Sequence, residues 1–247
     1  MARPRLLDRL CELHPTMDRE QLLARVLCGE VRVDGELVRD PRRPVSREQR
    51  VAVVVDHADA AAGGYVSRGG LKLEHAIRAW SLSVSGKVFL DAGSSTGGFT
   101  DCLLRHGARA VHAVDVGYNQ LAYALRTDER VIIHERTNIM DVTSLEPRPH
   151  AAVADLSFRS LRGAAARLLD LVSDSWAVLL VKPQFEWRSP PPEFDGIVPE
   201  EAVDAIVRET LSELESDGID VAGVEESPFR GRKGNREFLV LARLATT

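Results

Sequence analysis

The sequence predicts an α/β fold built on a doubly wound, mostly parallel sheet, preceded by a small α+β module. Three observations lead to this prediction. From residue 88 onwards, short apolar runs alternate with helical patterns, which is typical of strand–helix–strand units. A glycine-rich turn, Asp91–Gly98, stands between the first of these runs and a helix. The first 60 residues differ, because two helical stripes there lead into a hairpin pattern.

The composition is that of a globular protein in a reducing compartment. The 247 residues are 44% hydrophobic and 28% charged, which argues against wholesale disorder. Cys11, Cys28 and Cys102 are scattered and form no C-x-x-C pair, so we expect neither disulfides nor a zinc site. The chain begins without a long apolar segment, and its longest strongly apolar run, Trp176–Val181, is too short to span a bilayer. We therefore expect a cytoplasmic protein without a membrane anchor.

Residues 1–60 are expected to form a small module of their own. Leucines spaced as on one helix face mark a first helix near residues 6–13. Asp18 and Gln21 have the spacing of a capping box that opens a second helix. Gly29 follows the last apolar residues of that helix and is expected to end it.

The second half of this module combines a hairpin with arginines. Val31–Val38 alternates around Asp34–Gly35, a dipeptide typical of hairpin turns, and Val45 and Val51–Val55 are expected to supply further strand. The net charge of −5 does not by itself indicate nucleic-acid binding. Several arginines would nevertheless share one side of the module, namely Arg25, Arg32, Arg39, Arg42, Arg43 and Arg47. The arrangement resembles the small RNA-binding domain named after ribosomal protein S4, and a generic protein-binding module is the alternative.

Residues 57–64 have the small, flexible composition of a linker, so residues 61–247 are expected to form the second domain. Its strand patterns fall at Val88–Leu90, Ala110–Val114, Val131–His134, Ala151–Ala154, Trp176–Val181, Val221–Glu225 and Glu237–Ala242. Helical patterns fall between most of them, as at Leu161–Leu171 and Glu200–Leu214. This alternation predicts the doubly wound sheet.

The turn Asp91–Gly98 is the most informative functional feature. Its glycines let the backbone approach a ligand, and the following helix offers free N–H groups. Asp115 ends the next strand about twenty residues on, where a carboxylate can accept hydrogen bonds from both ribose hydroxyls of a cofactor. The glycine spacing is not G-x-G-x-x-G, which favours S-adenosylmethionine over NAD, and a plain turn with a surface aspartate is the alternative. The predicted cofactor-binding residues are Asp91, Gly93, Ser94, Ser95, Thr96, Gly97, Gly98, Asp115, Asn138 and Asp155.

Charged residues follow two strands of the predicted sheet. Asp155 comes directly after Ala151–Ala154, and Lys182 comes directly after Trp176–Val181. Because ligands of open α/β sheets lie beyond the carboxyl ends of the strands, both side chains should reach the ligand edge. Only four of the 32 basic residues are lysines. Lysine can lose its proton when desolvated, whereas arginine effectively cannot, so a chain with this bias would keep lysine where arginine does not serve.

Seven segments of the second domain form a recognisable set. They are Tyr65–Gly70 with Lys72, Asp91–Asp101, Ala113–Tyr118, Glu135–Asn138, Asp155–Phe158, Lys182–Glu186 and Gly234–Glu237. With them the chain resembles the TlyA (hemolysin A-type) family of rRNA 2′-O-methyltransferases over almost the whole second domain. The resemblance implies a Rossmann-like class I methyltransferase fold and S-adenosylmethionine as the cofactor.

The resemblance also implies a Lys-Asp-Lys-Glu tetrad of catalytic residues, which falls on Lys72, Asp155, Lys182 and Glu237. A ribose 2′-hydroxyl is a poor nucleophile and must lie in line with the electrophilic sulfonium methyl group. The positive charges of the cofactor and of a second lysine would disfavour the charged form of Lys182, whose neutral amine could then accept the hydroxyl proton. Asp155 and Glu237 would orient the lysines, and Lys72 would help to position the ribose or its phosphate. No metal is needed, because the leaving group departs as a neutral thioether.

The implied substrate is ribosomal RNA within ribosomal subunits, at a cytidine ribose of 16S or 23S rRNA or of both, and the family implies sensitisation to ribosome-targeting cyclic peptide antibiotics. The N-terminal module would dock on RNA shape and phosphates. The predicted RNA-binding residues are Arg25, Arg32, Arg39, Arg42, Arg43, Arg68, Arg230, Arg232 and Lys233. The basic loop Arg230–Arg236 is equally compatible with a solvated surface, and Asn138 with a loop cap instead of a contact to the adenine edge.

Three other functions are compatible with parts of the sequence. They are methylation of another structured RNA such as tRNA, a non-catalytic RNA-binding or ribosome-assembly factor, and a pore-forming cytolysin. The intact tetrad argues against the second, and the missing signal and membrane segments argue against the third. The segment Trp187–Gly196 departs from the glycine- and lysine-rich loop that is usual in the family, which bears on substrate specificity.

Overall fold

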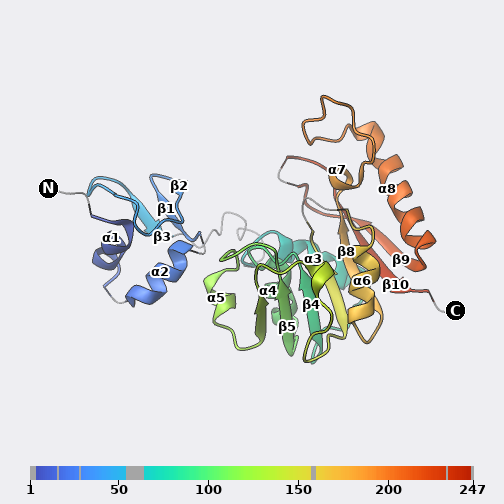
Figure 1. Cartoon of the computed structure of the whole chain (residues 1–247), viewed down its shortest axis with the longest axis horizontal. Helices are drawn as coiled ribbons and strands as arrows, with labels where there is room; N and C mark the ends of the chain where they lie inside the picture. The colour runs from blue at the N-terminus through green and yellow to red at the C-terminus, as the bar shows by residue number, and fades with distance from the viewer. Residues whose placement is uncertain are drawn as a thin grey trace.

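The computed structural model describes residues 4–15, 17–27, 29–53, 64–156, 160–231 and 233–245, and these residues build two sheets (Figure 1). The small sheet has three strands within residues 31–53, and the large sheet has seven strands within residues 88–244. Cys28, Arg232 and the predicted linker at residues 57–64 lie outside the described residues, with the exception of Gly64.

The N-terminal module has the predicted order of two helices and a hairpin. Its elements are α1 (Leu6–Leu13), α2 (Arg19–Leu27), β1 (Val31–Val33), β2 (Glu36–Leu37) and β3 (Val51–Val53), and its sheet is antiparallel with the order β2-β1-β3. Asp34 and Gly35 have positive φ angles of 52° and 87°, as a type I′ hairpin turn requires. The backbone N–H of Asp18 donates to Oε1 of Gln21 at 3.4 Å, which is one half of the predicted capping box.

The strand expected at Val45 is absent from the described part of the module. Pro44 has no N–H to donate to a ladder, and the pairing there is reduced to an isolated bridge between Arg5 and Pro44. Val45 is nevertheless fully buried in a hydrophobic cluster that both helices and the sheet share. The module therefore has an apolar core of its own.

The large sheet has the strand order β6-β5-β4-β7-β8-β10-β9. Its strands are β4 (Val88–Ala92), β5 (Ala110–Val114), β6 (Val131–His134), β7 (Ala151–Ala154), β8 (Trp176–Val181), β9 (Ile219–Glu226) and β10 (Phe238–Leu244). The first five run parallel, and β10 runs antiparallel to both β8 and β9. The predicted doubly wound, mostly parallel sheet is confirmed, although Glu237 lies just before the last strand instead of opening it.

Helices cover both faces of this sheet (Figure 1). One face carries α3 (Gly69–Ala79), α4 (Gly98–Arg105) and α5 (Tyr123–Arg126), and the other carries the 3₁₀ helix η1 (Ile139–Asp141), α6 (Ala164–Leu171) and α8 (Glu200–Ser216). Each face of the sheet has its own apolar core beneath these helices. Along β4, Phe89 packs into the core under α3 and α4, and Leu90 packs into the core under α6 and α8, because successive side chains of a strand point to opposite faces. A single turn, α7 (Pro183–Glu186), follows β8. No helix among the described residues is long and apolar enough to cross a membrane.

A buried carboxylate joins the module to the large domain. Glu30 is 6% exposed; Oε2 accepts a hydrogen bond from Arg25 at 2.8 Å, and Oε1 accepts one from the backbone N–H of Tyr123 at 2.7 Å. The Arg25 guanidinium lies 5.2 Å from the centre of the Tyr123 ring. Because Tyr123 opens α5, Glu30 caps that short helix from a distant part of the chain.

Asp91 near the end of β4 is a fully buried carboxyl group in the apolar middle of the sheet. The Thr100 hydroxyl donates to Oδ2 at 2.6 Å, whereas Oδ1 has no hydrogen-bond partner among the described residues. Burial raises the pKa of Asp91 from its ordinary value of 3.8 to about 7, and the Thr100 bond opposes this shift. The folded state therefore binds the proton of Asp91 more tightly than the unfolded chain does.

We expect the Asp91→Asn variant to lose part of the pH dependence of stability. In the wild-type protein, the proton on Asp91 stabilises the fold at acidic pH, and this contribution is lost as the pH rises from about 4 to about 7. At about 1.4 kcal/mol for each pH unit crossed, the loss is at most about 4 kcal/mol. Denaturant unfolding at pH 5 and pH 8 measures the part of this loss that lies above pH 5, about 3 kcal/mol. Equal pH dependence in the variant and the wild type would contradict a raised pKa at Asp91.

Candidate active site

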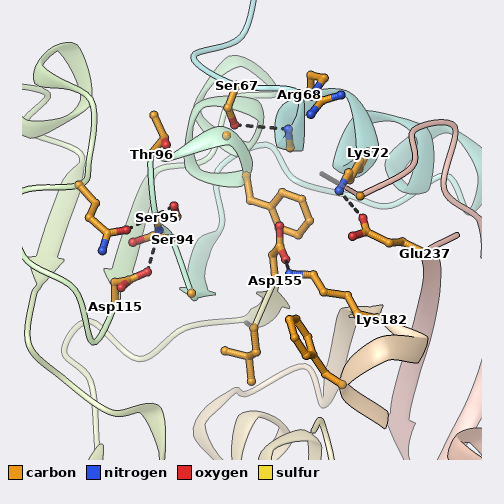
Figure 2. A pocket seen from close by; sticks show the side chains of 18 of the residues that line it. Ser67, Arg68, Lys72, Ser94, Ser95, Thr96, Asp115, Asp155, Lys182 and Glu237 are labelled. Carbon is orange, nitrogen blue, oxygen red and sulfur yellow. Dashed lines mark hydrogen bonds and ion pairs between the residues drawn. The ribbon is translucent and has the colours of Figure 1, made fainter. Parts of the chain in front are cut away.

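A pocket of about 740 Å³ opens at the carboxyl edge of the large sheet. It lies beside β4. From this strand the chain adds β5 and β6 on one side and then β7 and β8 on the other, and ligands of open α/β sheets bind at such a reversal of strand order. The turn after β4, the start of α3, the ends of β7 and β8 and the segment before β10 all contribute to its lining (Figure 2). Three of the four lysines of the chain line it: Lys72, Lys182 and Lys233.

The turn after β4 approaches the neighbouring strand so closely that a side chain is excluded. Gly93 has a φ angle of +80°, and a Cβ atom there would lie 2.6 Å from the carbonyl oxygen of Asp155. The carboxylate of Asp115 holds the turn, because its Oδ2 accepts a hydrogen bond from the Ser95 N–H at 2.8 Å (Figure 2). Its Oδ1 accepts a hydrogen bond from the Gly117 N–H at 2.6 Å, within the loop that follows β5. Asp115 therefore shapes the turn and also faces the pocket.

Eight of the ten predicted cofactor-binding residues line the pocket, namely Gly93, Ser94, Ser95, Thr96, Gly98, Asp115, Asn138 and Asp155. Asp91 and Gly97 lie outside the lining. A Cβ atom on Gly97 would collide with Leu121 and Leu125, so this glycine permits contact with α5 instead. Asn138 accepts a hydrogen bond from the Met140 N–H at 3.1 Å and thus caps the η1 helix at the pocket wall.

The four residues of the expected tetrad lie in this pocket and form two ion pairs (Figure 2). Nζ of Lys72 on α3 is 2.5 Å from Oε2 of Glu237, which lies 165 residues further along the chain. Nζ of Lys182 is 2.5 Å from Oδ1 of Asp155. The side chains of both lysines are about one-tenth exposed, at 11% and 10%, so each charge is largely removed from water and is balanced by its own carboxylate.

Basic residues at the mouth of the pocket come from two segments. Arg68 precedes α3, and Arg230 and Lys233 belong to the loop before β10; all three line the pocket. Arg230 lies 3.5 Å from Glu200, and Lys233 donates to the carbonyl oxygen of Asp195. Part of the predicted basic loop is therefore neutralised by α8, while its lysine holds the segment Trp187–Gly196 against the pocket.

The predicted arginines of the module have different surroundings. Arg25 is engaged with Glu30 and Tyr123, and Arg39 packs against Gly29. Arg32 donates to the carbonyl oxygen of Gly35, and Arg43 forms an ion pair with Glu36 at 2.9 Å. The side chain of Arg42 is 82% exposed, with Asp40 at 3.9 Å. Arg42 therefore presents an accessible charge.

Sequence reasoning gave no role to the aromatic and amide side chains of the pocket, although all of them except Gln120 lie in segments that it singled out. These residues are Phe99, Gln120, Gln184, Phe185 and Phe194. Phe185 and Phe194 line it near Lys182, and Phe194 packs edge-on against Trp187 with ring centres 5.2 Å apart. The segment Trp187–Gly196, which departs from the family pattern, thus contributes to the pocket wall.

Comparison with known proteins agrees with this geometry. Residues 65–244 match the model of the FtsJ-like methyltransferase family. The chain is 40% identical over 235 residues to the 16S/23S rRNA (cytidine-2′-O)-methyltransferase TlyA of Mycobacterium tuberculosis, with 92% of this chain and 85% of TlyA covered. The chain belongs to the FtsJ-like methyltransferase family, and within it to the TlyA group.

Two further relatives support the assignment. YqxC of Bacillus subtilis, named as a candidate rRNA methyltransferase, is 46% identical over 181 residues, which cover 71% of this chain and 64% of YqxC. A solved structure from Streptococcus thermophilus, described as a hemolysin, is 34% identical with a TM-score of 0.69 and covers 100% of this chain and 90% of that one. The expected Rossmann-like methyltransferase fold of the second domain, the methyltransferase activity and the use of S-adenosylmethionine are confirmed at the level of this family.

We expect Asp115→Ala to weaken the binding of S-adenosylmethionine by roughly 10- to 100-fold, since a hydrogen bond to a charged group contributes about 1.5–3 kcal/mol. The loss combines the acceptor for the ribose hydroxyls with the support that Asp115 gives to the N–H groups of Ser95 and Gly117. Isothermal titration calorimetry measures it. Asp128→Ala is the matched control, because Asp128 pairs with Arg130 outside the pocket lining. Unchanged affinity in Asp115→Ala would remove Asp115 from the cofactor site.

Proposed function

We propose that this protein transfers the methyl group of S-adenosylmethionine to the 2′-hydroxyl of a cytidine in ribosomal RNA. The observation that carries the proposal is the pair of lysine–carboxylate ion pairs, Lys72–Glu237 and Lys182–Asp155, beside the glycine turn in one pocket. The substrate is inferred from TlyA of Mycobacterium tuberculosis, which is named for this reaction on 16S and 23S rRNA. A cytoplasmic location is part of the same proposal, because ribosomal subunits are the substrate.

The described residues fit S-adenosylmethionine. The absence of side chains at Gly93 and Gly98 lets the turn pack against the backbone of Asp155 and against the start of α3, which brings these parts of the pocket wall together. Asp115 retains acceptor capacity for ribose hydroxyls, since each of its oxygens accepts one hydrogen bond from a backbone N–H and a carboxylate oxygen can accept two. Asn138 and Ile139 lie on the wall beside it. When bound, the cofactor supplies a methyl group on a positively charged sulfur.

Lys182 is the group that takes the proton in this proposal. Nζ of Lys182 would accept the proton of the 2′-hydroxyl as the 2′-oxygen takes the methyl group, which the cofactor would supply and from which it would depart as a neutral thioether. Asp155, 2.5 Å from Nζ, then stabilises the ammonium group that has formed.

Lys72 and Glu237 have a positioning role in this proposal. Lys72 extends from the first turn of α3 and is held by Glu237, so its ammonium group has one preferred place in the pocket. An ammonium group placed there can bind the ribose or the adjacent phosphate of the target nucleotide. Such binding supplies the alignment on which transfer to a weak nucleophile depends.

The N-terminal module is proposed to dock on the RNA. Its resemblance to the S4-type domain and its exposed Arg42 and Arg47 support this role. Structured RNA is recognised largely through shape and phosphates, which arginines contact. The module would thereby bring a nucleotide of the bound RNA to the pocket of the second domain.

The test of the proposal is transfer of labelled methyl groups from S-adenosylmethionine to isolated 30S and 50S subunits that lack the modification. Incorporation at a cytidine 2′-oxygen, mapped by the resistance of the modified ribose to alkaline cleavage, is the expected result. Incorporation into tRNA alone would place the substrate in another RNA class. Tight cofactor binding without transfer to any RNA would contradict the enzymatic role.

We expect Lys182→Ala to lower the transfer rate by about 10²–10⁴-fold, the usual contribution of a general base, and to leave cofactor affinity nearly unchanged. Lys87→Ala is the matched control, because Lys87 forms an ion pair with Asp174 and does not line the pocket. Single-turnover kinetics and calorimetry measure the two quantities. A Lys182→Ala protein with nearly normal turnover would show that another group takes the proton.

We expect the double variant Arg42→Ala, Arg47→Ala to bind RNA more weakly at every sequence tested. Each lost phosphate contact reduces the dependence of log K on log salt by about 0.9, so the slope should fall by up to about 2. Arg208→Ala, which removes an exposed arginine from α8, controls for net charge. Filter binding at several salt concentrations measures the slope. An unchanged slope would remove these two arginines from the RNA contact.

A further inference from the structure

Glu186 at the end of α7 is a buried carboxylate that the proposed mechanism does not use. The residue is 2% exposed, and burial raises the pKa of its carboxyl group. A carboxylate is costly to bury unless hydrogen bonds compensate for the lost hydration. The position closes the segment Lys182–Glu186, in which Lys182 is the residue proposed to take the proton.

The hydrogen bonds of Glu186 all come from the segment that follows β7. Its Oε2 accepts from the hydroxyl of Ser160 at 2.5 Å, and its Oε1 accepts from the backbone N–H of Leu161 at 2.9 Å. Its own carbonyl oxygen accepts from the guanidinium of Arg162 at 3.1 Å. Ser160 Oγ in turn accepts from the N–H of Arg162 at 3.1 Å, so the small cluster is internally satisfied.

These bonds link the two chain segments that carry the ion pair. Asp155 lies at the end of β7, five residues before Ser160, and Lys182 lies at the end of β8, four residues before Glu186. The Phe185 N–H donates to the carbonyl oxygen of Lys182 at 2.8 Å, so α7 begins directly from Lys182. The carboxylate of Glu186 therefore anchors the turn that begins at Lys182 to Ser160 and Leu161, while Lys182 itself pairs with Asp155.

We propose that Glu186 is a positioning residue that holds Lys182 against Asp155 in the orientation needed for proton transfer. The expected effect of Glu186 on catalysis rests on the proposed function. The expected effect of Glu186 on the position of Lys182 rests on the geometry alone. Without the carboxylate, α7 loses its bonds to Ser160 and Leu161 and keeps only the bond from Arg162 to the backbone carbonyl oxygen of residue 186, so that Nζ of Lys182 is less well fixed. A misplacement of about 1 Å in an active site can lower a rate by about 10²-fold.

The experiment compares full-length Glu186→Ala and Glu186→Gln with the wild type. In the alanine variant we expect kcat for methyl transfer to 30S or 50S subunits to fall about 10- to 100-fold, with KM for S-adenosylmethionine unchanged. In the glutamine variant the amide oxygen still accepts from the Leu161 N–H, and the amide group still reaches the Ser160 hydroxyl, so most of kcat should return. Ser160→Ala, a milder change, should lower kcat several-fold and serves if Glu186→Ala does not fold.

A spectroscopic readout separates positioning from general stability. With lysine labelled with ¹³C at the ε-carbon, the four lysines give four signals that lysine-to-arginine variants assign. Glu186→Ala should shift or broaden the Lys182 signal and leave that of Lys87, which pairs with Asp174, in place. Glu213→Ala is the matched control, because Glu213 pairs with Arg162 and Arg188 from α8 without contact to the Glu186 carboxylate. It should lower the melting temperature but keep kcat.

Two results would overturn the inference. One is a folded Glu186→Ala protein with normal kcat and an unmoved Lys182 signal. The other is a fall in melting temperature, cofactor affinity and kcat in Glu186→Ala that Glu213→Ala reproduces to the same extent instead of keeping kcat, which would mark Glu186 as structural only. If the wild type transfers no methyl group to any RNA, the proposed function fails, while the Lys182 signal still tests the position of Glu186.

Discussion

The pocket depends on the register of three parallel strands. Phe89 of β4 lies opposite Ala151 of β7, and Ala152 of β7 lies opposite Ala177 of β8. With this register the glycine turn, Asp155 and Lys182 leave the sheet at one edge. A slip of one residue would turn the side chains of a whole strand to the opposite face, so the two apolar cores that fix the register also fix the chemistry.

Charge balance is the second constraint at this edge. Buried ions are stable only when they are paired, and each lysine of the expected tetrad has a carboxylate at 2.5 Å. A cofactor with a positive charge therefore enters a pocket whose carboxylates are already engaged. The ends of β7 and β8 place Asp155 and Lys182, and the two ion pairs balance the buried charges.

Short-range patterns in the sequence were sufficient to predict the strands and the residues at their ends. Asp155 and Lys182 follow apolar runs directly, and a parallel sheet places such residues at one edge. The pairing of Lys72 with Glu237 depends on how α3 packs against the end of the sheet, and no local pattern encodes a contact over 165 residues.

The exceptions have the same cause, which is tertiary contact. Asp91 and Gly97 belong to the glycine turn in sequence. Asp91 is nevertheless fully buried in the sheet, and Gly97 faces α5. Arg25 sits among the arginines of the module, yet its guanidinium lies over Tyr123 beside Glu30. The capping role of Asn138 and the cluster around Glu186 likewise depend on which loops meet.

The scarcity of lysine has a consequence for the chemical biology of this protein. Three of the four lysines line the pocket, and Lys87 is held in an ion pair elsewhere. A reagent that acylates or condenses with lysine side chains would therefore concentrate its damage where a ligand binds. Reversible aldehydes that carry a nucleoside could exploit this distribution as covalent inhibitors, and occupancy of the pocket would be visible as protection from such labelling.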